Sequence, residues 1–122
     1  MNELTDDDAT LLQRNDPYSD AWDETSFLGR LMDDGLFDED GYAEVEAAII
    51  DAVNDGVDFA TLGEILRIIE RMTLMLKRHV DAGDEFRITN LDDAQVAELD
   101  QRVRFCLLEI SLGNAPDTSR WT

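Results

Sequence analysis

The sequence has almost none of the residues that build metal and nucleophilic sites, since it contains one cysteine, Cys106, and one histidine, His79. A single cysteine excludes an internal disulfide framework and fits a reducing compartment. Zinc sites need several cysteine or histidine ligands. The di-iron helical-bundle motif needs Glu-x-x-His, whereas Leu76 lies three residues before His79. We therefore expect no metal centre and no cofactor.

Calcium sites need oxygen ligands at fixed loop positions, and the acidic stretch 33–40 does not supply them. Placing Gly41 at position 6 of an EF-hand loop puts Leu36 at position 1 and Ala47 at position 12, where carboxylates are required. A calcium ion held loosely by these acidic residues is the alternative that stays open.

The chain also lacks long apolar runs and known catalytic motifs. No stretch approaches the ~18 apolar residues of a membrane span. The first ten residues, MNELTDDDAT, are acidic where a secretory signal is basic and then apolar. There is no glycine-rich phosphate loop, no serine nucleophile motif and no internal repeat. We therefore expect a soluble, cytoplasmic protein that is not an enzyme.

Basic residues are scarce, and the acidic excess is concentrated in one half of the chain. The net charge is −19, from 29 acidic and 10 basic residues. Residues 1–58 contain 18 acids and 2 bases, and residues 59–122 contain 11 acids and 8 bases. Such a surface repels nucleic acids and anionic membranes and attracts a basic partner. Solubility and adaptation to high salt are the alternative explanations of the charge.

The longest apolar segment, FATLGEILRIIERMTLMLKRHV, predicts a central buried helix over residues 59–81. At the helical period its apolar residues form two adjacent stripes. Asp58 is the expected N-cap. A helix this apolar must be covered from two sides, so we predict an all-α fold, a compact bundle of about four main helices. The stripes are Phe59, Leu62, Leu66, Ile69, Leu76 and Val80, and Ile65, Ile68, Met72 and Met75.

Three further helices are expected around the central one. The first runs from about Ser19 or Thr25 to Asp34 and ends at Gly35, and the second spans about 40–54. An extended connector over 84–89 leads to a last helix capped by Asn90. The predicted organisation is a flexible acidic arm (1–18), one helical domain (19–114) and a C-terminal tail (115–122).

The acidic residues of the first half form the candidate functional surface. If the first two helices make a hairpin, their outer sides and the linker between them carry one negative patch. Trp22 lies off the apolar stripe of its helix, so it is either a lid on the core or an exposed anchor for a partner. The candidate partner-binding residues are Asp33, Asp34, Asp38, Glu39, Asp40, Glu44, Glu46, Asp51 and Trp22.

A second candidate surface is apolar and lies near the end of the last helix. Phe105, Leu108 and Leu112 fall opposite the inner stripe that contains Cys106. Either the tail folds back and covers them with Trp121, or they form an interface for a partner or a second copy of the chain.

Three functional hypotheses follow from these patterns. The leading one is a small acidic inhibitor, of the immunity-protein, antitoxin or phage anti-defence type, whose carboxylates mimic phosphates and neutralise a basic nucleic-acid-acting protein. The alternative is a non-catalytic structural or accessory subunit that docks through the apolar surface. The third is a small enzyme that uses carboxylates of the first two helices.

Overall fold

The computed structural model describes residues 6–121, and this part of the chain is helical with no strand. It forms five α-helices and a final 3₁₀ turn, so the all-α prediction is confirmed. The helices are α1 (Asp6–Arg14), α2 (Phe27–Asp34), α3 (Glu39–Asp55), α4 (Phe59–Val80) and α5 (Asp93–Ser111), and the turn η1 spans Ser119–Trp121.

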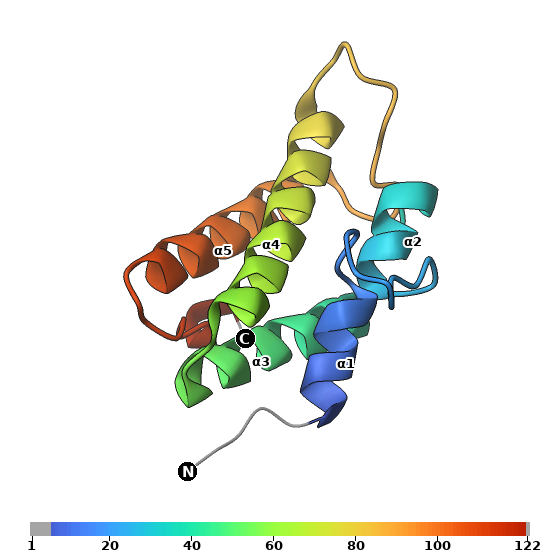
Figure 1. Ribbon diagram of the computed structural model, residues 1–122. Coiled ribbons are helices and arrows are strands. Elements are labelled where there is room, and N and C mark those ends of the chain that lie inside the picture. Colours follow the sequence, from blue (N-terminus) through green and yellow to red (C-terminus); the bar gives the residue numbers. More distant parts are fainter. Residues whose placement is uncertain (1–5, 122) are drawn as a thin grey trace.

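Helix α4 occupies the middle of the molecule, as its apolar sequence predicts. It packs against α5, α2 and α1, while α3 crosses below and packs mainly against α1 (Figure 1). All five helices contribute to one hydrophobic core. The buried side chains of α4 come from both predicted stripes and are Ile65, Ile68, Ile69, Met72, Met75 and Leu76.

The ends of the predicted apolar stripes are exposed. Phe59 is 93% exposed, Val80 is 68% exposed and Leu66 is 37% exposed, so their prediction as core residues is wrong. The helical period gives the direction of a side chain around the axis but not its position along the axis relative to the core. Phe59 and Val80 are the first and last residues of α4 and are not covered by its neighbours, and Leu66, further along the helix, is only partly covered.

Local capping signals explain where most helices begin and end. The Ser26 hydroxyl accepts a hydrogen bond from the Gly29 amide, so α2 begins later than predicted. The Asp58 carboxylate accepts from the Thr61 amide and starts α4 as expected. Asp92, rather than the predicted Asn90, caps α5, and it forms a reciprocal capping box with Gln95.

Helix α1 is the main departure from the predicted organisation. Residues 6–18 were expected in a flexible arm, but they include α1 and its C-terminal turn, in which Leu12, Asn15 and Asp16 are at most 1% exposed. Leu12 belongs to the core, and the Asn15 side-chain oxygen accepts from the Leu28 amide at the start of α2. The prediction of a loose segment is therefore wrong for residues 6–18, and residues 1–5 lie outside the described residues.

The connector between α4 and α5 is extended without forming a strand, as predicted, and it is tied to the turn between α2 and α3. The Thr89 amide donates to the Gly35 carbonyl oxygen at 2.8 Å. The Asn90 side chain bonds both the amide and the carbonyl of Phe37, at 2.8 and 2.7 Å. Gly35 has a φ of +63°, and a Cβ there would lie 2.4 Å from the Arg87 carbonyl oxygen. Only glycine fits this junction.

Candidate functional site

Five predicted site residues cluster at the turn between α2 and α3. Asp33 and Asp34 end α2 and are exposed, and Glu39 and Asp40 are exposed in the first turn of α3. Asp38, the N-cap residue of α3, is half-buried, and its carboxylate lies 3.8 Å from Arg30. These residues are called the linker acids: Asp33, Asp34, Asp38, Glu39 and Asp40.

A second acidic group forms where α1 packs on α3. Glu44 shares a shallow hollow of about 430 Å³ with Asp7, Asp8 and Arg14. The Asp8 carboxyl shares a hydrogen bond with Asp51 further along α3. This group, Asp7, Asp8, Glu44 and Asp51, is called the α1–α3 acids. The contribution of α1 was missed, although the acidic run Asp6 to Asp8, followed after two residues by Leu11 and Leu12, is typical of the first turn of a helix.

The carboxyl group of Asp51 lies in a negative environment. Desolvation and the neighbouring charges of Asp8 and Asp55 raise its pKa above the ordinary 3.8.

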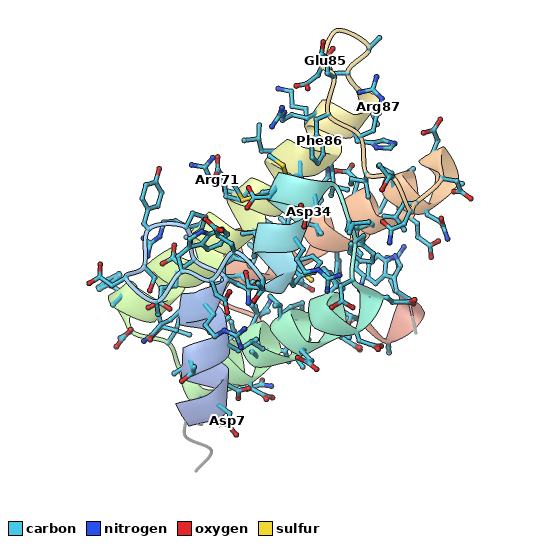
Figure 2. All side chains as sticks on the ribbon, turned by 90° about the vertical axis from the view of Figure 1, so that its right-hand side faces the viewer. Asp7, Asp34, Arg71, Glu85, Phe86 and Arg87 are labelled. Atoms are coloured by element: carbon cyan, nitrogen blue, oxygen red, sulfur yellow. The ribbon has the colours of Figure 1, made fainter. Side chains whose placement is uncertain are left out.

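Figure 2 shows residues of both acidic groups on one side of the molecule. Asp34 lies near its middle and Asp7 at the free end of α1 (Figure 2). The structure therefore adds α1 to the predicted acidic surface of α2 and α3.

One predicted site residue, Glu46, does not belong to this surface. Glu46 was placed on the solvent side of α3, but it is 6% exposed. Its carboxylate accepts hydrogen bonds from Arg102 of α5 at 2.8 and 2.6 Å and from the Tyr42 hydroxyl at 2.5 Å. Burial raises the pKa of Glu46, but these bonds outweigh burial and hold its pKa below the ordinary 4.5. The buried pair joins α3 to α5.

Trp22 is half-buried and packs against the hydrophobic core. Of the two roles considered for it, this position fits a lid on the core. Its contact with a partner stays a prediction.

The arginines are largely paired within the protein, whereas most exposed acids are not. Arg67 pairs with Asp16, Arg102 with Glu46, and Arg14 with Asp23, each at 2.6–2.7 Å. In contrast, Asp33, Asp34, Glu39, Asp40 and Glu44 have no hydrogen bond or ion pair from their side chains within residues 6–121. These five unpaired carboxylates lie in the linker acids and the α1–α3 acids, and further exposed carboxylates, such as Glu24 and Glu98, lie elsewhere on the surface.

A groove of about 320 Å³ opens between the start of α3, α5 and the C-terminal tail. Its walls include three aromatic rings and two carboxylates, and this combination was not predicted. Phe37 packs against Tyr42 with ring centroids 5.6 Å apart. This groove is called the Trp121 groove, and its chemically distinctive lining residues are Phe37, Glu39, Tyr42, Glu98, Arg102 and Trp121.

The predicted apolar surface of α5 is only partly covered. The tail folds back, Pro116 is buried, and the Trp121 ring lies 5.2 Å from the ring of Phe105. Leu108 and Leu112 remain 58% and 65% exposed. The tail therefore covers Phe105 in part and leaves Leu108 and Leu112 exposed.

The two residue types that most often carry catalysis are used structurally. Burial raises the pKa of the Cys106 thiol to about 12, so the thiolate is disfavoured. His79 is 8% exposed, its Nδ1 accepts a hydrogen bond from the Ile88 amide at 2.9 Å, and its Nε2 lies 3.2 Å from Asp93. His79 thus fixes the connector onto α4 and α5.

Searches for metal-binding and membrane-spanning features give no candidate in the described residues. Among residues 6–121, no three histidine, cysteine or carboxylate side chains are grouped so that they could hold a metal ion. No helix in this part of the chain is both long and apolar enough to cross a bilayer.

Comparison of the chain with protein-family models, with curated proteins and with solved structures gives no significant match in any of the three.

Proposed function

We propose that this protein binds a basic protein through the linker acids and the α1–α3 acids, and inhibits it. The observation that carries the proposal is the difference in pairing between the charges. Five exposed carboxylates, those of Asp33, Asp34, Glu39, Asp40 and Glu44, lack a partner within residues 6–121, while most arginines are held in internal ion pairs. A basic partner would supply the missing counter-charges.

The expected partner acts on nucleic acid. Clefts that hold a phosphate backbone are positively charged, and carboxylates displayed along helices present a comparable negative surface to them. Association with such a partner would be fast and sensitive to salt. An inhibitor of this kind, such as an immunity protein, an antitoxin or a phage anti-defence protein, needs no catalytic group of its own. We place it in the cytoplasm, which agrees with its single, unpaired cysteine.

The test is affinity purification of the tagged protein from its native host at low salt, followed by elution with increasing salt and mass spectrometry. One basic protein released by moderate salt is the expected result. The triple substitution Glu39→Lys, Asp40→Lys and Glu44→Lys should abolish capture of that protein, because all three carboxylates are exposed and unpaired within residues 6–121.

The matched control makes the same change in net charge outside the two acidic groups. Asp20, Glu24 and Glu85 are exposed, and substituting each with lysine should leave most of the binding intact. Equal loss of binding in both triple variants would show that net charge alone, rather than a defined surface, causes capture, and would refute the proposal.

A second candidate function is that of an accessory subunit that docks through α5. It is favoured by the exposure of Leu108 and Leu112, at 58% and 65%, beside the folded tail. The double variant Leu108→Glu and Leu112→Glu distinguishes the two functions. It should abolish docking through α5 and leave binding through the acidic groups unchanged.

A further inference from the structure

The Trp121 groove has the composition of a site for a cation. Aromatic rings of Phe37, Tyr42 and Trp121 line it, and the carboxylates of Glu39 and Glu98 lie at its walls. Ring faces and carboxylates both attract positive charge, and rings do so without requiring the cation to be fully hydrated. The volume of about 320 Å³ is at the lower end of the range for ligand pockets, about 300–1,000 Å³, and suits one long side chain.

The chain already places its own arginines against this lining. The Arg102 guanidinium lies over the Tyr42 ring, with its central carbon 5.3 Å from the ring centroid, while it pairs with Glu46 through two hydrogen bonds. Arg120, which does not line the groove, places its guanidinium 4.4 Å from the centroid of the Trp121 ring. Stacking on a ring combined with two-point bonding to a carboxylate is characteristic of arginine.

The charged groups of the groove lining that have no ion pair within residues 6–121 are negative. Gln95 is engaged with the Asp92 amide, and Asn90 bonds the Phe37 backbone on both sides. The positive charge of Arg102 is compensated by Glu46. Glu39 and Glu98 are exposed and have no ion pair within residues 6–121. The groove therefore offers two uncompensated carboxylates next to aromatic surface.

We propose that the Trp121 groove binds an arginine side chain, presented by the basic partner. The inference rests on the proposed function for the identity of the partner, but the groove's preference for arginine can be measured without one. Lysine fits less well, because its ammonium is a compact, strongly hydrated charge that cannot stack or bond a carboxylate at two points. Glu98 and Glu39 would bond the guanidinium, and the half-buried rings of Phe37 and Trp121 would contact its face, because Tyr42 is buried and already covered by Arg102.

The test uses N-acetyl-arginine amide as the probe and the indole N–H signals of the full-length protein in NMR spectra. The signal of Trp121, identified with Trp121→Phe, should shift in a saturable way with a Kd of about 1–10 mM. The signal of Trp22, which lies against the core, should not shift. N-acetyl-lysine amide should bind at least about threefold more weakly.

The decisive variants are Glu98→Gln and Glu24→Gln. Both residues are exposed and unpaired within residues 6–121, but only Glu98 lines the groove, and Glu24 lies outside both acidic groups. Glu98→Gln should weaken arginine binding about five- to tenfold, and Glu24→Gln should leave it unchanged. Equal effects of the two substitutions, equal binding of the two probes, or no saturable shift at Trp121 would each overturn the inference.

The outcome is separable from that of the proposed function. If the captured basic protein binds wild type and Glu98→Gln equally well, the groove inference fails and the acidic-surface proposal stands. If N-acetyl-arginine amide binds at Trp121 but no basic protein is captured from the host, the groove inference stands and the inhibitor proposal fails.

Discussion

Asp16, at the end of α1, and Arg67, on α4, are joined by two hydrogen bonds of 2.9 and 2.7 Å across 51 residues of sequence. The Asp16 side chain is 1% exposed and that of Arg67 is 38% exposed. Burial raises the pKa of Asp16, but the hydrogen bonds from Arg67 and from the Tyr18 amide outweigh burial and leave the pKa below the ordinary 3.8. This pair fixes α1 to the central helix.

We predict that Arg67→Ala destabilises the protein by about 2–3 kcal/mol, because it leaves a buried carboxylate without its charged partner. Urea unfolding followed by circular dichroism at 222 nm, the usual helix signal, measures the change. Arg104→Ala is the control, since Arg104 pairs with Asp100 at the surface and should cost no more than about 0.5 kcal/mol. Similar losses in both variants would contradict a structural role for the Asp16 pair.

Acid should unfold the protein through Asp16 and Glu46. Both have a folded-state pKa below the unfolded value, which is near 3.8 for aspartate and 4.5 for glutamate. Their contribution to stability is complete above these unfolded values and is lost as the pH falls through the lower folded-state values. The free energy of unfolding, measured from pH 7 to pH 2, should therefore drop below about pH 4. In Glu46→Gln the drop should be smaller.

Asp51→Asn should stabilise the protein at neutral pH. The Asp51 pKa is raised by desolvation and by Asp8 and Asp55, so the ionised carboxylate is unfavourable in the folded state. The folded state binds this proton more tightly than the unfolded chain, and stability contributed by Asp51 therefore rises as the pH falls toward its ordinary pKa. We expect a gain of about 0.2–0.5 kcal/mol for this exposed group, which salt should reduce.

The control for Asp51→Asn is Glu85→Gln, which removes an exposed carboxylate of the connector between α4 and α5, away from α1 and α3. Thermal unfolding at low and high salt compares the two. A Glu85→Gln variant with the same gain and the same salt dependence would show that the effect comes from net charge and not from the contact between α1 and α3.

Gly35→Ala should destabilise the protein more than Gly113→Ala. Both glycines have positive φ, +63° and +81°, so each substitution carries backbone strain of about 1–2 kcal/mol. A Cβ at Gly35 also meets the Arg87 carbonyl oxygen at 2.4 Å, whereas nothing lies within 4 Å of one at Gly113. The Tm difference between the two variants measures the close approach alone. Equal Tm values would mean that the connector moves aside freely.

The predictions from sequence succeeded where one local signal decides the structure. Gly35 and Gly56 end α2 and α3, and Asp58 begins α4, as their residue types indicate. The interior of α4 was predicted to be buried because its apolar residues form two adjacent stripes, which is more apolar surface than one packed face covers. These features depend on neighbours within a few residues.

The predictions failed where distant residues decide. α1 is a helix of nine residues, too short to be stable alone, and it is held by Leu12 in the core and by Arg67. Glu46 lies on the polar side of α3 by periodicity, yet Arg102 of α5 compensates its buried charge. The acidic surface was foreseen from composition, whereas the Trp121 groove depends on how the tail returns to α3 and α5.

The bonds from Thr89 to Gly35 and from Asn90 to Phe37 close loops of more than 50 residues. Closing such a loop costs more chain entropy than forming a helix turn, so we expect these contacts to form late in folding. Asn90 and Phe37 line the Trp121 groove, which therefore exists only after the connector has docked. A molecule that binds in the groove would therefore bind only the fully folded protein. It would slow unfolding, because it would stabilise the contacts between the connector and the turn between α2 and α3.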